Sequence, residues 1–166
     1  MNPGGLRTDI LFAGSPAGEG DGQVTFRELF DVQPFSNTVN TATLTGGDIK
    51  AVLEQQFPSA VRDSTLLLST SDGFAYTYDP ARAEGDRVFA CSITIDGMVV
   101  DPAATYRIAV NSFLLAGGDA FTAFTAGTDP VTGPLDVDTA VAYLAANSPL
   151  TPPAGDHALP APTPGC

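Results

Sequence analysis

Two phenylalanines of this chain stand in loop-like sequence among amides, small residues and a carboxylate. Phe35 lies in the segment Gln-Pro-Phe-Ser-Asn, and Phe113 lies in Asn-Ser-Phe-Leu-Leu-Ala-Gly-Gly-Asp. A flat base held against an aromatic face gains about 1–3 kcal/mol per ring. Neighbouring polar groups such as Asn37 and Asp119 are able to read the edge of a base or the hydroxyls of a ribose. The residue types therefore indicate a site for a nucleoside.

A third segment near the chain start adds a means of holding phosphate. It reads Asn-Pro-Gly-Gly-Leu-Arg from Asn2 to Arg7, so it combines a flexible glycine backbone with a guanidinium. Only 7 basic residues stand against 19 acidic ones, a formal net charge of −12, and the overall field repels polyanions. The charge therefore argues against binding of a nucleic acid. Any phosphate contact must be local, and Arg7 is the candidate.

Helix signals position the first ring. Thr25 and Glu28 have the capping-box spacing, which predicts a helix to about Val32. Pro34 then forces an extended chain, so Phe35 and Asn37 are expected on a loop at the helix exit.

The remaining pattern predicts an α+β domain with a layered mixed or antiparallel sheet and short helices packed outside it. A second capped helix begins at Thr45, with Asp48 three residues on, and ends at Pro58. Two more short helices are expected over 120–124 and 137–146, the latter capped by Asp136 or Asp138. Asp96-Gly97 is a two-residue hairpin signal. Strands are expected near 23–24 and over 38–44, 66–69, 74–78, 87–95, 98–100 and 106–111.

Length and composition predict one folded domain over residues 1–150, followed by a proline-rich linker or tail over 151–166. The site-like loop stands directly after Met1, and we interpret the chain as a piece of a longer protein. Cys91 is expected as a buried core thiol on an apolar strand face, and a disulfide to Cys166 is the alternative. The sequence has no apolar run long enough for a membrane span.

Residues for independent catalysis are scarce. The sole histidine, His157, lies in the proline-rich tail, and the sole lysine, Lys50, lies in a predicted helix. No metalloprotease, serine-hydrolase or P-loop signature occurs. A stand-alone enzyme would have to use carboxylates such as Asp9 and Asp119, and no defined spacing pairs them.

The three segments, in their order and spacing, resemble the C-terminal substrate-binding domain of the 5'-nucleotidase and UDP-sugar hydrolase family. The resemblance extends from about Asn2 to Phe124. It is carried by the NGGGIR-type loop, the Thr25-to-Asn37 stretch, the Leu44-Thr45-Gly46 turn and the Asn-Ser-Phe…Gly-Gly-Asp segment.

The resemblance implies a role for each candidate residue. Phe35 and Phe113 match two rings that enclose the base, and Asn37 matches a polar neighbour used in some members. Asp119 matches the carboxylate that accepts hydrogen bonds from the ribose, and Arg7 an arginine near the ribose and phosphate. Asn2 matches an amide of the same loop. Two simpler alternatives stay open: Asp119 caps the following helix, or Arg7 pairs with Asp9.

The resemblance also implies a division of labour. In the family, a separate N-terminal metallophosphoesterase domain carries divalent metals, and this chain would hold no metal or other cofactor. The expected function is nucleotide recognition for a nucleoside monophosphate or related nucleotide, in cis with that domain, in a secreted, periplasmic or cell-surface hydrolase. The alternative is an acidic extracellular interaction module that kept the fold without ligand binding.

Overall fold

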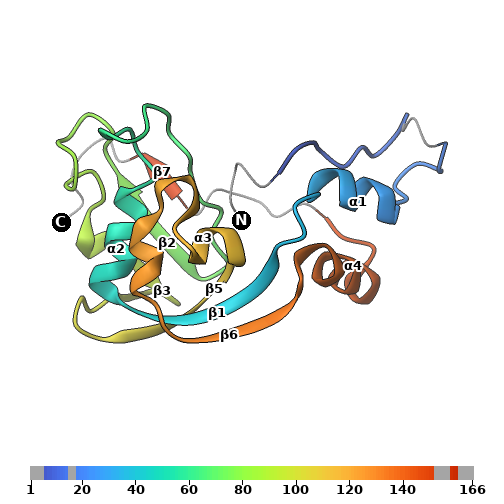
Figure 1. The fold of residues 1–166 in the computed structure, drawn as a ribbon. Coiled ribbons are helices and arrows are strands. Elements are labelled where there is room, and N and C mark those ends of the chain that lie inside the picture. The colour runs from blue at the N-terminus through green and yellow to red at the C-terminus, as the bar shows by residue number, and fades with distance from the viewer. Residues whose placement is uncertain (1–5, 15–17, 152–157, 161–166) are drawn as a thin grey trace.

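The computed structural model describes residues 6–14, 18–151 and 158–160, and it contains two sheets. The first sheet is built from three long antiparallel strands in the order β5-β1-β6 (Figure 1). Its strands are β1 (Thr38–Thr45), β5 (Thr105–Asn111) and β6 (Thr128–Leu135). In the register of β1 and β5, Val39 lies opposite Asn111 and Thr45 opposite Thr105. The start of β1 therefore lies beside the end of β5.

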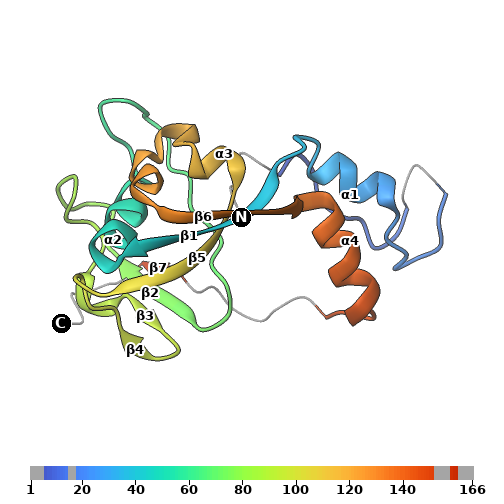
Figure 2. The ribbon, with the colours of Figure 1, turned by 60° about the horizontal axis from the view of Figure 1, so that its bottom comes forward.

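The second sheet has the order β4-β3-β2-β7 and lies beneath the first in Figure 2. Strands β2, β3 and β4 are antiparallel, whereas β7 runs parallel to β2. Positive φ angles at Asp96 (50°) and Gly97 (77°) form the predicted hairpin between β3 and β4. The strands are β2 (Phe74–Tyr78), β3 (Thr94–Ile95), β4 (Met98–Val99) and β7 (Ala158–Pro160).

Two capping boxes start helices where the sequence predicts them. Thr25 caps α1 (Phe26–Val32) with Glu28, and Thr45 caps α2 (Gly46–Glu54) with Asp48. In each box the threonine hydroxyl accepts from the third helical amide and the acid accepts from the threonine amide. Further helical segments within the described ranges are α3 (Ser112–Leu115), α4 (Asp136–Asn147), and the 3-10 turns η2 (Ala90–Ser92), η3 (Gly118–Ala120) and η4 (Thr122–Ala126).

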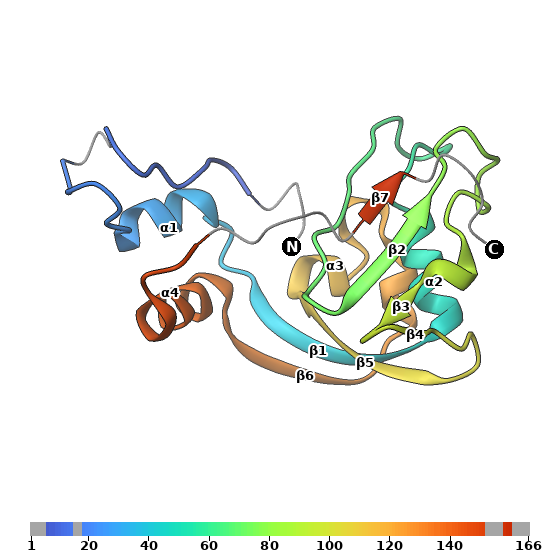
Figure 3. The same cartoon turned by 180° about the vertical axis from the view of Figure 1, so that it is seen from behind.

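The elements divide between a compact body and a helix pair. Helices α1 and α4 lie side by side, away from the body that contains α2, α3 and the second sheet (Figures 1 and 3). Strands β1 and β6 extend from the body to this pair and connect to α1 and α4 respectively. The described residues contain no helix long and apolar enough to cross a lipid bilayer.

The core lies in the body, where α2 and the turns after α3 pack on the second sheet. Leu44, Ile49 and Leu53 are buried together with the rings of Phe57 and Tyr76. Burial of large apolar side chains gives each about 1.5–3 kcal/mol of favourable transfer free energy. The mixed α+β class that the sequence predicts is therefore confirmed.

Several predicted strands are wrong. Residues 23–24 and 66–69 form no strand, and the predicted strand over 87–95 is reduced to a bridge at Val88, the turn η2 and the short β3. Cys91 lies on η2, is exposed and is disulfide-bonded, so a free buried thiol is also wrong. Cys166, the alternative partner named from the sequence, lies outside the described residues.

The structure also contains elements without a sequence prediction. Strand β6 includes Pro130, Gly133 and Pro134, residues that reduce strand propensity but are tolerated at a sheet edge, where β6 lies. Within the predicted tail, β7 pairs with β2. Helix α4 begins at Asp136, one residue before the predicted start at Val137. Its N-cap is Leu135, which makes no side-chain cap bond.

Candidate functional site

Phe35 lies on the short connection between α1 and β1. The helix ends at Val32, and Ser36 adopts a left-handed φ of 55°, so the chain turns sharply between Phe35 and the strand. The Phe35 side chain remains 43% exposed. A ring of this size half open to water on a turn is available for a ligand, unlike the core phenylalanines.

Phe113 lies on α3, directly after β5. Asn111 caps this helix through its side-chain oxygen, which accepts from the Leu114 amide at 2.8 Å. Leu114 points into the core, whereas Phe113 remains 43% exposed. Its ring passes over Gly118, where a Cβ atom would lie 2.5 Å from the ring atoms Cε1 and Cζ. The second glycine of the Gly-Gly-Asp segment therefore leaves room for the ring.

A direct hydrogen bond joins the two ring-bearing segments. The Ser112 hydroxyl donates to the Asn37 side-chain oxygen at 3.1 Å, and it accepts from the Thr38 amide at 3.2 Å. Residues 75 positions apart are thereby held together where the start of β1 lies beside the end of β5. Asn37 thus has a structural bond in addition to the ligand role that the resemblance implies. The sequence could not show this link, because it depends on the register of the sheet.

Asp119 lies on the turn η3 after Phe113, in the left-handed region with φ 53° and ψ 29°. Ala120 follows with φ 65°. The Asp119 carbonyl accepts from the Arg62 guanidinium. The alternative that Asp119 caps the following helix is wrong, because the N-cap of η4 is Phe121, without a side-chain cap bond.

Arg7 lies against the first ring. Its guanidinium carbon is 4.9 Å from the centroid of Phe35, and its backbone amide donates to the Val32 carbonyl at 3.0 Å. The positive charge is therefore placed beside the exposed ring, and the described residues contain no ion pair between Arg7 and Asp9. Asn2, the other candidate of this loop, lies outside the described residues.

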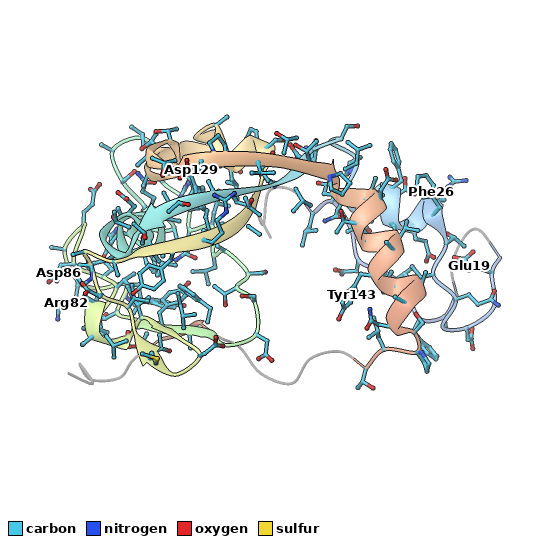
Figure 4. The ribbon with its side chains drawn as sticks, turned by 90° about the horizontal axis from the view of Figure 1, so that it is seen from below. Glu19, Phe26, Arg82, Asp86, Asp129 and Tyr143 are labelled. Atoms are coloured by element: carbon cyan, nitrogen blue, oxygen red, sulfur yellow. The ribbon has the colours of Figure 1, made fainter. Side chains whose placement is uncertain are left out.

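Two hollows adjoin these loops. One of about 440 Å³ lies between α4 and the first sheet and is lined by residues such as Val39, Asn111, Leu114 and Tyr143. Partial burial raises the pKa of the Asp136 carboxyl in its wall above the usual value. Figure 4 shows Tyr143 on α4, on the side that faces the body. The other hollow, of about 480 Å³, lies between α2 and residues 120–122.

The described residues offer no metal centre. No group of three or more His, Cys, Asp or Glu side chains in these ranges is arranged to hold a metal ion. His157 lies outside the described residues. The side chains that the structure describes therefore do not fit the divalent metals that phosphoester hydrolysis uses, and no metal-dependent step is assigned to them.

Sequence reasoning missed two residues that shape this region. Arg62 is not among the candidate residues taken from the sequence, yet its guanidinium donates to the Asp119 carbonyl. Gln56 was not singled out, yet its side chain is completely buried and bonds to three partners. Their roles depend on contacts between residues distant in sequence, so no local sequence pattern predicts them.

The fold defines the class of protein: an α+β domain with two sheets that presents exposed aromatic residues on the α1–β1 connection and on α3, at the end of one sheet. The family model for the 5'-nucleotidase C-terminal domain matches residues 1–126. The chain therefore belongs to this family, as the sequence resemblance predicts.

Individual relatives agree with this assignment. The chain is 35% identical over 127 residues to the trifunctional nucleotide phosphoesterase protein YfkN of Bacillus subtilis, covering 75% of this chain and 8% of that protein. It is 30% identical over 144 residues to the cell wall protein Lmo0130 of Listeria monocytogenes, covering 86% of this chain and 18% of that protein.

A solved structure is similar over almost the whole chain. The 5'-nucleotidase precursor of Thermus thermophilus superposes with a TM-score of 0.78 at 27% identity, covering 98% of this chain and 31% of that one. The chain thus spans less than a third of each of these three relatives.

Proposed function

We propose that residues 1–150 form the nucleotide-recognition domain of a 5'-nucleotidase-like hydrolase, with residues 151–166 as a linker or tail. One observation carries the proposal: two rings 78 positions apart in the sequence, Phe35 and Phe113, are both 43% exposed on segments that the Asn37–Ser112 hydrogen bond joins. Family membership supports the same role.

The proposed contacts follow from the chemistry of each side chain. Phe35 and Phe113 contact the faces of the base, and Asn37 reads its edge. Asp119 accepts hydrogen bonds from the ribose hydroxyls. Arg7, whose guanidinium lies 4.9 Å from the Phe35 ring centroid, is placed near the ribose and phosphate, together with Asn2.

Bond cleavage is assigned in this proposal to a metallophosphoesterase domain outside the chain, joined in cis. The size of the relatives supports this division, because each contains more than twice the length that this chain covers. Recognition at one domain lowers the barrier at another by holding the phosphate in position, without local acid or base groups.

We propose a secreted, periplasmic or cell-surface location. A relative named as a cell wall protein supports it. The disulfide at Cys91 also supports it, because disulfides persist mainly in oxidising compartments outside the cytosol.

The test is a titration of adenosine and of AMP, to millimolar concentration, into the isotope-labelled chain, followed by NMR. Signals of Phe35, Phe113 and Asp119 are expected to shift together with one dissociation constant. Replacing either ring with alanine is expected to weaken binding about fivefold or more, since each stacking contact contributes about 1–3 kcal/mol.

Phe26→Ala is the matched control. Phe26 is also an exposed ring, but it lies at the beginning of α1, on the helix pair outside the body (Figure 4). This variant should bind like the unmodified chain. If no signal moves at millimolar adenosine or AMP, the isolated chain has no autonomous nucleotide site and the interaction-module alternative gains support.

A further inference from the structure

Arg62 is a charged side chain that the proposed ligand contacts do not use, and it is held by backbone groups from three segments. Its Nε donates to the Ser64 carbonyl at 3.0 Å. Its two terminal nitrogens donate to the carbonyls of Gln55, at the end of α2, and Asp119. All three nitrogens of the guanidinium are therefore engaged in fixing the main chain.

The same guanidinium also lies over an aromatic ring. Its central carbon lies 5.0 Å from the centroid of Phe121, which is completely buried. A planar guanidinium that stacks on a fixed ring has a defined orientation, and its donors then point in fixed directions. Arg62 thus connects the end of α2 to the turn that carries Asp119.

That turn needs external support. Asp119 and Ala120 are consecutive residues with side chains in the left-handed region, at φ 53° and 65°. Such conformations persist only where the surrounding contacts impose them. Gln55 provides a second contact, because its side chain donates to the Thr122 hydroxyl at 2.8 Å and accepts from the Ala123 amide at 2.9 Å. The turn is thereby held on both sides of Phe121.

We propose that Arg62 is a positioning residue that sets the orientation of the Asp119 carboxylate and so determines the preference for a hydroxylated sugar. The inference rests on the proposed function, in which Asp119 accepts from the ribose. The rotamers open to a side chain depend on its backbone angles, so fixing the Asp119 carbonyl also fixes where its carboxylate points. Arg62 itself does not contact the ligand in this proposal.

The test compares adenosine with 2',3'-dideoxyadenosine, which lacks both ribose hydroxyls on the edge that Asp119 is proposed to read. In Arg62→Lys, the charge remains, but a single ammonium replaces the planar guanidinium that bonds to three backbone carbonyls. The variant is expected to bind adenosine about tenfold more weakly, the effect of losing one hydrogen bond to a carboxylate, and to bind the dideoxy nucleoside as before. Isothermal titration calorimetry measures both affinities.

Arg82→Lys is the matched control. Arg82 also stacks on a phenylalanine, 5.2 Å from the Phe89 centroid, and its Nε donates to a carbonyl, that of Asp86, at 2.8 Å. These contacts involve no residue of the Asp119 turn, so the control should leave both affinities and their ratio unchanged. Equal weakening of both ligands in Arg62→Lys, or no weakening of either, would overturn the positioning role.

A second readout separates this inference from the proposed function. The Phe121 amide donates to the Gly118 carbonyl at 3.0 Å, within the supported turn, and its hydrogen exchange in ligand-free protein should quicken in Arg62→Lys but not in Arg82→Lys. Quickened exchange without nucleoside binding by the unmodified chain refutes the proposed function alone. Unchanged exchange refutes the support that Arg62 gives to the turn.

A measurement on the unmodified chain covers the case in which Arg62→Lys does not fold. Because coupling between two contacts is reciprocal, a ligand that bonds to Asp119 must also stabilise the Arg62 contact. Adenosine should therefore slow solvent exchange of the protons on Arg62 Nη1, the nitrogen that donates to the Asp119 carbonyl, more than dideoxyadenosine does at equal site occupancy. Equal slowing by the two nucleosides contradicts the proposal.

Discussion

Gln56 is a polar side chain with no exposed surface, and it connects three parts of the core below the site. Its oxygen accepts from the Tyr76 hydroxyl at 3.0 Å and from the Leu68 amide at 2.6 Å. Its nitrogen donates to the Leu53 carbonyl at 2.9 Å. The side chain thereby fixes residues 66–68, which form no strand, against α2 and β2. Gln56→Leu, of similar volume, removes these bonds without creating a large cavity.

The expected cost follows from the groups left without partners. The Tyr76 hydroxyl and the Leu68 amide would each lose a buried hydrogen bond, at about 1–3 kcal/mol each, whereas the Leu53 carbonyl keeps the Gln56 backbone amide as a donor at 3.4 Å. The added apolar burial of leucine offsets about 2 kcal/mol. We therefore expect Gln56→Leu to lower the free energy of unfolding by about 2 kcal/mol, a substantial share of the roughly 5–15 kcal/mol typical of a domain.

Urea denaturation followed by circular dichroism at neutral pH measures this change. Adding Tyr76→Phe to Gln56→Leu removes the orphaned hydroxyl, so the double variant should regain about 1–2 kcal/mol over Gln56→Leu alone. Gln23→Leu, at an exposed glutamine, should change stability by less than about 0.5 kcal/mol. A Gln56→Leu loss below about 1 kcal/mol, or a double variant no more stable than the single one, would refute the reasoning.

Two further predictions concern Tyr76 and Gly118. Burial, more than any neighbouring group, raises the pKa of Tyr76 from 10.0 to about 12, and its side chain is only 2% exposed. Because the hydroxyl ionises less readily in the folded chain than in the unfolded one, the free energy of unfolding should fall by about 3 kcal/mol as the pH rises from 10 to 12. Urea denaturation from about pH 9 to 12 should show this fall in the unmodified chain and not in Tyr76→Phe. Gly118→Ala places a Cβ 2.5 Å from the Phe113 ring and should weaken adenosine binding about tenfold in calorimetry as the ring moves away. Gly47→Ala, where the added Cβ would meet the Pro102 carbonyl oxygen at an ordinary 3.5 Å, should leave binding unchanged, and equal binding by both variants would contradict the role of the Phe113 position.

Local signals predicted the elements that depend only on neighbours in sequence. The capping boxes at Thr25 and Thr45 define α1 and α2 because each box satisfies its own helix amides. The Asp96-Gly97 hairpin formed for the same reason, since its two positive φ angles are intrinsic to that pair. Elements that depend on distant partners were missed. Strand β6 contains two prolines, which lack an amide donor. It still forms because it is an edge strand that pairs with β1 on one side only, so the missing donors are tolerated on the open side.

The candidate site divides in the same way. The family resemblance, together with the proline, glycine and amides around Phe35 and Phe113, predicted that both rings are available to a ligand, and both are 43% exposed although Phe113 lies on the short helix α3. The positions of the Arg62 and Gln56 side chains were not predictable, because each bonds to segments that approach only when the chain is folded.

By itself, the sequence determined the family, the α+β class, the capped helices and the choice of exposed aromatic residues, all of which follow from local chemistry and motif order. Only the tertiary structure decided that Ser112 bonds to Asn37 and that Arg62 holds the Asp119 carbonyl. Such contacts require the register of β1 against β5 and the packing of α2 beside η4. Those arrangements minimise the free energy of the whole chain, and no short segment encodes them.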